Sequence, residues 1–258
     1  MNKTYLKYLA LRGKVLFANP EVKNIFHASV QKTGSQWIKA IFDDPILQKY
    51  TKLITYPQHR YEWTEFQTKF PTKTFVPGLY ISYQSYEEIK KPSNYKTLYI
   101  YRDPRDLIVS WYYSMKYSHG LMGKVHKHRK YLKQVSEDEG ISYCIKHFHL
   151  KLSFMKDWYL NCNDPNVIFM KFEDLTSDPV KHFKFFLESC NIDISENELE
   201  TIINNYTKDE MRKKVQEKNK EVSHYRKDGK SWNELFTKQH HTLFNEINGN
   251  IVELLGYK

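Results

Sequence analysis

Short apolar runs alternate with amphipathic segments along this chain. Three runs have the length and the β-branched or aromatic content of buried strands. Each is followed by a segment whose apolar residues recur at helical spacing. The pattern therefore predicts strands that alternate with helices. The predicted strands are residues 25–30, 97–101 and 166–170.

Polar and proline residues mark the helix boundaries. The helix predicted over residues 35–42 ends at Asp-Asp-Pro. Asp103 and Pro104 provide an N-cap and a first-turn proline for a helix that should run through Tyr113, and Ser-Asp-Pro at 177–179 opens another. Strands alternating with helices indicate a parallel sheet, so we expect an α/β fold with a central parallel β-sheet flanked by helices.

We expect a single domain over residues 1–258. No repeat and no linker rich in Gly, Ser or Pro divides the chain. In open parallel sheets, ligands bind beyond the carboxyl ends of the strands. The loop after the first strand and Arg102 after the second are therefore candidate site segments.

The charge balance suggests an anionic partner. The chain has 40 Lys and Arg against 30 Asp and Glu, a formal net charge of +10. Nucleic acid, a membrane surface or a phosphorylated ligand would all fit this charge. The chain also has 20 Tyr and 15 Phe, which can stack on a ligand or fill a core.

The cysteines and the N-terminal segment bear on the compartment. Three widely spaced cysteines without a Cys-x-x-Cys pair predict a reduced, cytoplasmic protein without structural zinc. Basic residues interrupt the N-terminal segment, and no run reaches the ~20 apolar residues that span a bilayer, so we expect no membrane insertion. One side of an N-terminal helix could still lie on a membrane, although packing against the protein is the commoner outcome. That side comprises Tyr5, Leu6, Leu9, Leu16 and Phe17.

The turn Q-K-T-G-S-Q-W at residues 31–37 has the composition of a phosphate-binding loop. A helix N-terminus offers backbone N–H groups and a partial positive charge, and Gly34 allows close approach of the backbone. Lys32, Ser35 and Gln36 add donors. The Gly-Lys pair of a Walker A loop is missing, which disfavours a nucleotide triphosphatase. An ordinary βα turn with a surface lysine is the alternative interpretation.

This turn resembles the K-[ST]-G-[ST]-[ST]-W loop of cytosolic sulfotransferases that use 3′-phosphoadenosine 5′-phosphosulfate (PAPS). Three more segments match the family in order: R-D-P-R-D-L-I-V-S at 102–110, F-E-D-L with D-P at 172–179, and R-K-D-G-K-S-W at 226–232. The resemblance implies a P-loop NTPase-like sulfotransferase fold, PAPS as co-substrate, 3′,5′-adenosine bisphosphate (PAP) as product, and no metal. The residues that it assigns to the cofactor are Lys32, Thr33, Gly34, Ser35, Gln36, Trp37, Arg102, Ser110, Phe172, Arg226, Lys227 and Asp228.

The sequence also departs from the family pattern. Gln36 replaces a hydroxyl residue, Phe172 replaces a tyrosine near the adenine, and the last loop is one residue shorter, with Asp228 where glycine is usual. The family's general base is the histidine of a K-T-H-L-P strand. The aligned stretch K-T-F-V-P has Phe75 at that position, and a phenyl ring cannot accept a proton.

The predicted catalytic residues are Lys32 and a general base. The resemblance assigns Lys32 to the bridging oxygen of the leaving bisphosphate. For the base we consider Glu62 or His59, because Golgi-type sulfotransferases use a Glu soon after the phosphosulfate helix, and His119 is a further candidate. Each of these could equally be a solvated polar side chain.

The predicted partner is a small-molecule acceptor, sulfated on oxygen or nitrogen. Aromatic residues between 50 and 86 could wall an apolar acceptor pocket or fill the core. Usage rich in Tyr and Lys fits a bacterial or cyanobacterial natural-product pathway, such as that of an alkaloid. Two other functions stay open: a nucleoside or nucleotide kinase, which needs Mg²⁺ and ATP, and a basic nucleic-acid-binding module. The oligomeric state is also open.

Overall fold

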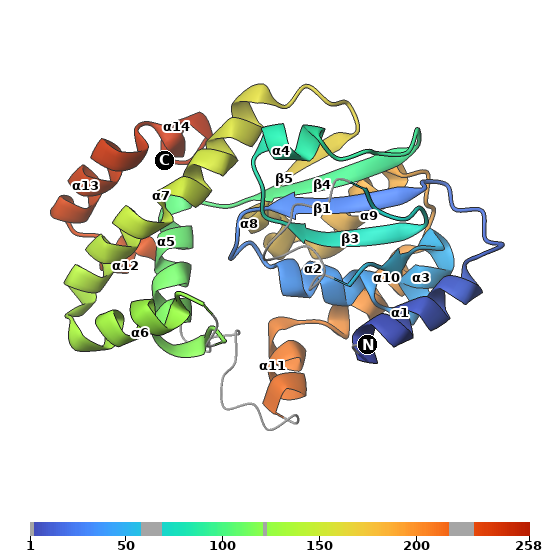
Figure 1. The fold of residues 1–258 in the computed structure, drawn as a ribbon, viewed down its shortest axis with the longest axis horizontal. Helices are drawn as coiled ribbons and strands as arrows, with labels where there is room; N and C mark the ends of the chain where they lie inside the picture. Colours follow the sequence, from blue (N-terminus) through green and yellow to red (C-terminus); the bar gives the residue numbers. More distant parts are fainter. Residues whose placement is uncertain (1–2, 58–68, 121–122, 217–229) are drawn as a thin grey trace. The chain divides into compact units, whose positions relative to one another are not determined.

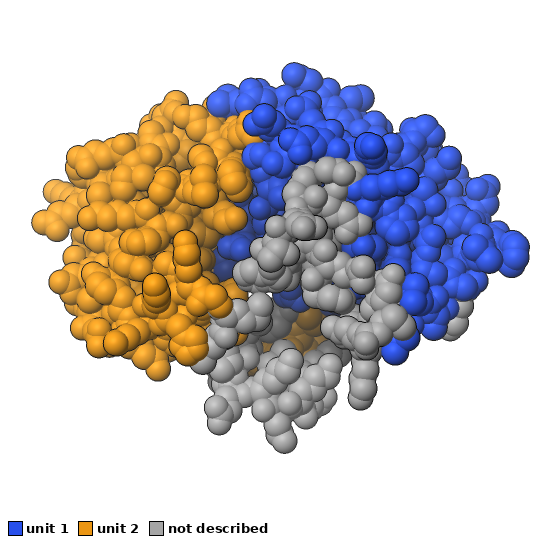
Figure 2. Space-filling view, viewed as in Figure 1, with its two compact units in different colours: residues 1–101, 160–206 blue, residues 102–159, 207–258 orange. Residues whose placement is uncertain are grey.

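The computed structural model describes residues 3–57, 69–120, 123–216 and 230–258. Its contacts group the chain into two compact units, coloured separately in Figure 2. Unit 1 comprises residues 1–101 and 160–206, and unit 2 comprises residues 102–159 and 207–258. Each unit is described by itself.

Unit 1 contains a five-stranded parallel sheet in the order β2-β3-β1-β4-β5. Figure 1 shows β3, β1, β4 and β5 side by side. The three predicted strands are confirmed to within two residues at each end. The strands are β1 (Asn24–Ser29), β2 (Ile54–Thr55), β3 (Thr74–Leu79), β4 (Tyr95–Tyr101) and β5 (Val167–Lys171).

Helices flank this sheet, which confirms the predicted α/β class. Ile25, Leu98 and Ile100 on one face of the sheet form a buried core with residues of α2, α9 and α10. Asp-Asp-Pro, predicted only as the end of one helix, also starts the next, since Asp44 accepts a hydrogen bond from the Ile46 N–H at 2.7 Å. The helices of unit 1 are α1 (Lys3–Lys14), α2 (Ser35–Phe42), α3 (Pro45–Thr51), α4 (Tyr83–Glu87), α8 (Phe172–Ser177), α9 (Pro179–Ser189) and α10 (Glu196–Asn204).

The other face of the sheet is aromatic. Phe26 contacts Phe70, with ring centroids 5.9 Å apart, and Phe70 contacts Tyr56 at 5.3 Å. Tyr86 of α4 reaches the same face, where its hydroxyl lies 2.6 Å from Thr97 Oγ1. Aromatic residues between 50 and 86 thus contribute to the core. The alternative of core packing, left open by the sequence, accounts for Tyr56, Phe70 and Tyr86.

Unit 2 is helical in its described residues. Asp103 caps α5 by accepting a hydrogen bond from the Arg105 N–H at 2.8 Å, and α5 ends at Tyr113 as predicted. It continues into a π-helical turn, η2. The elements are α5 (Pro104–Tyr113), η2 (Ser114–Ser118), α6 (Val125–Gln134), α7 (Glu137–Asn161, of which residues 160–161 fall in unit 1), α11 (Lys208–Gln216), α12 (Trp232–Leu235), α13 (Lys238–Asn248) and α14 (Ile251–Leu254).

Candidate active site

The carboxyl ends of three neighbouring strands share one edge of the sheet. Ser29 of β1 pairs with Ile100 of β4, and Tyr101 of β4 pairs with Lys171 of β5. The loop of residues 30–34 follows β1, and Phe172 follows β5 at this edge. Arg102 comes directly after β4 in the chain. The rule that ligands bind at the carboxyl ends of parallel strands therefore selects these segments.

The loop between β1 and α2 is held in an unusual backbone conformation. Lys32 and Gly34 have φ values of 78° and 77°, and a left-handed conformation is uncommon for lysine. Thr33 lies buried between them, and its hydroxyl donates a hydrogen bond to the Val30 carbonyl at 2.9 Å. The Ser29 and Ser35 hydroxyls are 3.5 Å apart across the turn. Backbone strain that is held in place by such contacts is typical of ligand-binding loops.

The N-terminus of α2 is available to an anion. Gly34 is the N-cap residue, and no described side chain caps this end. The Gly34 carbonyl accepts hydrogen bonds from the N–H groups of Trp37 and Ile38, at 2.8 and 3.1 Å. The first amides of a helix have no partner within the helix. Together with the helix dipole, the Ser35 and Gln36 amides form the donor set expected of a phosphate cradle.

Gly34 also packs against Phe172. A Cβ atom at position 34 would lie 2.8 Å from Cε2 of Phe172, a distance that real Cβ contacts do not reach. Two residues assigned to the cofactor, 138 positions apart, are therefore neighbours in unit 1. The sequence suggested glycine for close approach of the backbone to a phosphate. The contact with Phe172 is a second reason, and no local signal predicts it.

The aromatic residue of the loop anchors its helix. The Trp37 ring contacts Phe183 of α9 edge-on, with centroids 5.6 Å apart. Gln36, which replaces a hydroxyl residue of the family pattern, is exposed. Trp37 thus fixes the helix behind the loop, while Gln36 remains accessible to solvent.

Arg102 and Ser110 lie on one side of α5 in unit 2. Arg102 forms an ion pair with Asp106, with Nη2 and Oδ2 3.8 Å apart. Ser110 is four residues after Asp106, so both lie on the same helix face. Two residues that the family resemblance assigns to the cofactor are thus brought to one side of this helix.

Arg105 is a residue that the sequence analysis missed. It is buried, it donates to both oxygens of Asp103 at 3.0 and 2.7 Å, and its guanidinium lies 3.4 Å from the centroid of the Trp232 ring. The Trp232 N–H donates to Asp106 Oδ1 at 3.2 Å. The chain is therefore fixed to the first turn of α5 as it leaves the R-K-D-G-K-S-W segment. The signal in the sequence was the second Arg of R-D-P-R-D.

Five of the predicted site residues lie outside the described part of the chain. They are His59, Glu62, Arg226, Lys227 and Asp228. Their assignments stay predictions.

Two residues near the sheet are excluded as general bases. Phe75 is buried near the amino end of β3 and stacks on Phe42, with ring centroids 4.0 Å apart. His27 of β1 is fully buried, and desolvation lowers its pKa to about 3. Its Nδ1 accepts a hydrogen bond from the Gly78 N–H at 3.2 Å, beside an irregularity in the β1–β3 pairing. His27 therefore has a structural role.

His119, the remaining candidate, follows η2. Its backbone N–H donates to the Ser114 carbonyl at 2.7 Å, and its Nδ1 lies 3.1 Å from the Gly120 carbonyl. The backbone bond makes it the residue that ends the π-helical turn. A role in catalysis remains a prediction for this histidine.

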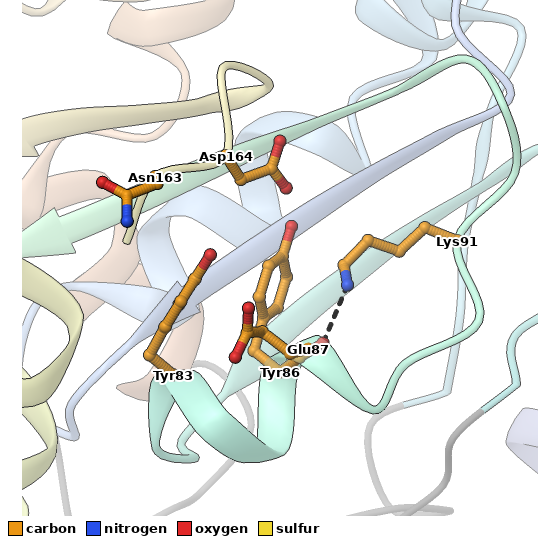
Figure 3. A pocket seen from close by; sticks show the side chains of 6 residues that line it. All are labelled: Tyr83, Tyr86, Glu87, Lys91, Asn163 and Asp164. Carbon is orange, nitrogen blue, oxygen red and sulfur yellow. Dashed lines mark hydrogen bonds between the residues drawn. The ribbon is translucent and has the colours of Figure 1, made fainter. Parts of the chain in front are cut away.

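A pocket of about 350 Å³ opens in unit 1 near the amino ends of β4 and β5 (Figure 3). Lys91 donates to the carbonyls of Tyr86 and Ile89 at 2.9 and 3.2 Å. Asp164 accepts from the Tyr95 hydroxyl and from the Asn166 N–H. Because Lys91 and Asp164 already bind within the protein and the pocket lies at the opposite edge from the loop of residues 30–34, we interpret it as a structural polar cluster. Its lining residues are Tyr83, Tyr86, Glu87, Lys91, Asn163 and Asp164.

Comparison with known proteins identifies the family. Residues 23–256 match the sulfotransferase domain family, so the chain belongs to it. A flavonol 3-sulfotransferase of Flaveria bidentis is 26% identical over 209 residues, which cover 71% of this chain and 61% of that protein. A flavonol sulfotransferase-like protein of the same plant is 27% identical over 204 residues, 71% of this chain and 64% of its own. The chain thus spans less than two thirds of the length of these relatives.

Solved structures share the fold. Mouse sulfotransferase SULT7A1, complexed with PAP, superposes with a TM-score of 0.61 at 19% identity, covering 94% of this chain and 88% of its own. Retinol dehydratase in complex with retinol and PAP gives a TM-score of 0.60 at 14% identity, covering 96% of this chain and 86% of its own. The predicted sulfotransferase fold is confirmed.

The described residues contain neither a membrane-spanning helix nor a cluster of metal ligands. None of their helices is long and apolar enough to cross a membrane. Within the same residues, no group of three or more His, Cys, Asp or Glu side chains is arranged to hold a metal ion.

Proposed function

We propose that this chain transfers the sulfuryl group of PAPS to a hydroxyl, amine or amide group of a small molecule. Membership of the sulfotransferase family supports the reaction class. The observation that carries the proposal is the loop of residues 30–34, in which two left-handed residues lead into the uncapped N-terminus of α2. This arrangement suits the phosphosulfate end of the donor.

In this proposal the protein acts by positioning and by charge stabilisation. The Ser35 and Gln36 amides orient the phosphosulfate, and Lys32 stabilises the charge that develops on the leaving bisphosphate. Arg102 and Ser110 bind the 3′-phosphate, and Phe172 lies near the adenine. An in-line displacement with a stabilised leaving group needs little covalent help from the protein.

The general base is proposed to be Glu62 or His59. Phe75 and His27 are unsuitable, because the first has no proton acceptor and the second is buried with its Nδ1 already engaged. A hydroxyl acceptor needs a base near its proton, whereas a neutral amine can attack directly and lose its proton afterwards.

Hydroxyl compounds are the first acceptors to test. The relatives are named for flavonols, and a retinol dehydratase of the same fold was solved with androsterone and PAP. Phenols and alcohols should therefore be tested as acceptors before amines. Alkaloid-like natural products with ring nitrogens form the second class, which would distinguish N- from O-sulfation.

Thermal denaturation with three ligands tests the donor. PAP in the presence of EDTA should raise the melting temperature, whereas ATP with Mg²⁺ and a single-stranded oligonucleotide should not. Stabilisation by ATP with Mg²⁺ alone would favour a kinase. Stabilisation by the oligonucleotide alone, with strong salt dependence, would favour a nucleic-acid-binding module.

Lys32→Ala then tests the chemistry. We expect kcat with an identified acceptor to fall by about 100-fold, while the Kd for PAPS changes far less, since Lys32 acts mainly on the charge that develops in the transition state. Lys39→Ala, on the helix that follows the loop, is the matched control, because this partly exposed lysine pairs with Asp43 at 3.6 Å. Equal losses in the two variants would contradict the proposed role of Lys32.

A further inference from the structure

The N-terminal segment exposes a row of large apolar side chains. Phe17 is 94% exposed and Leu16 is 61% exposed, and Leu6 and Leu9 of α1 are also exposed. The Leu16 N–H donates to the Gly13 carbonyl at 3.3 Å, so the turn after Lys14 continues from the helix. At 3.6 residues per turn, positions 6, 9, 16 and 17 share one side. We call these four residues the apolar stripe.

The opposite side of α1 is fixed to unit 1. Tyr8 is 5% exposed, and its ring contacts Tyr56 edge-on with centroids 5.5 Å apart. The Arg12 guanidinium donates to the Thr72 carbonyl. The helix thus packs through a different side from the one named in the sequence analysis, and this packing directs the apolar stripe outward.

Two lysines hold the end of the apolar stripe. The Lys73 ammonium donates to the carbonyls of Val15 and Leu16, at 3.2 and 2.7 Å. The Lys52 ammonium donates to the Asn19 carbonyl at 3.2 Å. The turn that carries Leu16 and Phe17 is therefore held by hydrogen bonds from Lys52 and Lys73, and the positive charges of these two lysines lie close to it.

The segment of residues 1–20, which carries the stripe, has charge of one sign. Residues 1–20 include four basic residues, at positions 3, 7, 12 and 14, and no acidic residue. Large apolar side chains beside basic ones match the boundary of an anionic bilayer, where the apolar groups enter the acyl region and the cations meet lipid phosphates or carboxylates. An apolar protein partner would match the stripe without requiring the basic residues.

We propose that the apolar stripe is a docking surface for an anionic lipid membrane. Leu16 and Phe17 enter the interface, and Lys7, Lys52 and Lys73 provide electrostatic attraction. The protein binds the membrane from one side without spanning it. Such contact would give the enzyme access to apolar acceptors dissolved in the bilayer.

Vesicle co-sedimentation of the whole chain tests this proposal. We expect binding to phosphatidylcholine vesicles that contain phosphatidylserine, weaker binding to pure phosphatidylcholine, and loss of binding at high salt. The double substitution Leu16→Ser and Phe17→Ser should weaken binding at least tenfold. Phe185→Ser, at a phenylalanine of α9 that is 57% exposed, is the matched control and should bind as the wild type does.

Three outcomes would overturn the proposal. One is the absence of binding to anionic vesicles by the wild type, and another is equal binding by the double variant. The third is concentration-dependent self-association that the double variant abolishes, which would make the stripe an interface between copies. Circular dichroism of each variant shows whether it is folded, and Phe17→Trp adds a probe whose emission should shift to the blue on binding.

Discussion

At the scale of single residues, His27 illustrates a functional group used for structure. Its imidazole lies in the core beside Pro77 and Gly78, where β3 has two residues opposite one of β1. A bulge leaves a backbone amide without its partner in the sheet. Here that amide is the Gly78 N–H, and His27 Nδ1 accepts a hydrogen bond from it. Because Nδ1 is the acceptor, the proton is on Nε2, which has no hydrogen-bond partner among the described residues.

His27 should make the stability of the protein depend on pH. Burial lowers its pKa to about 3, whereas the unfolded chain binds a proton near pH 6.5. Between these values the unfolded state binds more protons, so the free energy of unfolding falls as the pH falls. The slope from this group is at most about 1.4 kcal/mol per pH unit.

Denaturant titrations between pH 7 and pH 4.5 measure this slope. His27→Gln keeps an acceptor for the Gly78 N–H but cannot titrate, so its stability should fall less steeply with decreasing pH than that of the wild type. His149→Gln, at an exposed position on α7, is the control and should retain the wild-type slope. Parallel curves for His27→Gln and the wild type would contradict the assignment.

At the scale of elements, the turn between β1 and α2 depends on contact with the β5–α8 junction. Gly34→Ala would combine a left-handed φ of 77° with a Cβ 2.8 Å from Phe172. We expect a loss of about 1–3 kcal/mol in the free energy of unfolding, together with weaker PAP binding. Phe172→Leu should partly restore the stability of the variant by removing the ring.

The control for Gly34→Ala separates backbone strain from the clash. Gly123 has a φ of 52°, and nothing lies within 4 Å of its would-be Cβ. Gly123→Ala should therefore show the cost of a positive φ without a clash, with a smaller loss of stability in chemical denaturation. If both variants lose the same stability, the contact between residues 34 and 172 has no energetic role.

The elements also show what the sequence could predict. Asp103 and Asp178 each precede a proline, and each accepts a hydrogen bond from a backbone amide at a helix start. These boundaries are local, so the sequence predicted them. The contacts of Arg105 with Trp232 and of Gly34 with Phe172 join residues more than 120 positions apart. No spacing rule predicts such pairs, and the family motifs contain all four residues without indicating which of them are neighbours.

At the scale of the whole molecule, the chain passes between the two units three times, after residues 101, 159 and 206. β5 therefore joins the sheet of unit 1 only after the chain has passed through α5, α6 and α7 of unit 2. Neither unit is one continuous segment. We therefore expect the two units to unfold cooperatively, and the single domain expected from the sequence stays a prediction.

Two buried thiols can test that cooperativity, because each unit has one. Cys190 lies in unit 1, where burial raises its pKa to about 12, and Cys144 lies in unit 2, where burial likewise raises its pKa. Both should resist alkylation at pH 8 until they are exposed, since the thiolate is the reactive form. In a chain with Cys162→Ser, brief alkylation at increasing guanidinium concentration, read by peptide mass spectrometry, should give one midpoint for both cysteines. Two separate midpoints would mean that the units unfold independently.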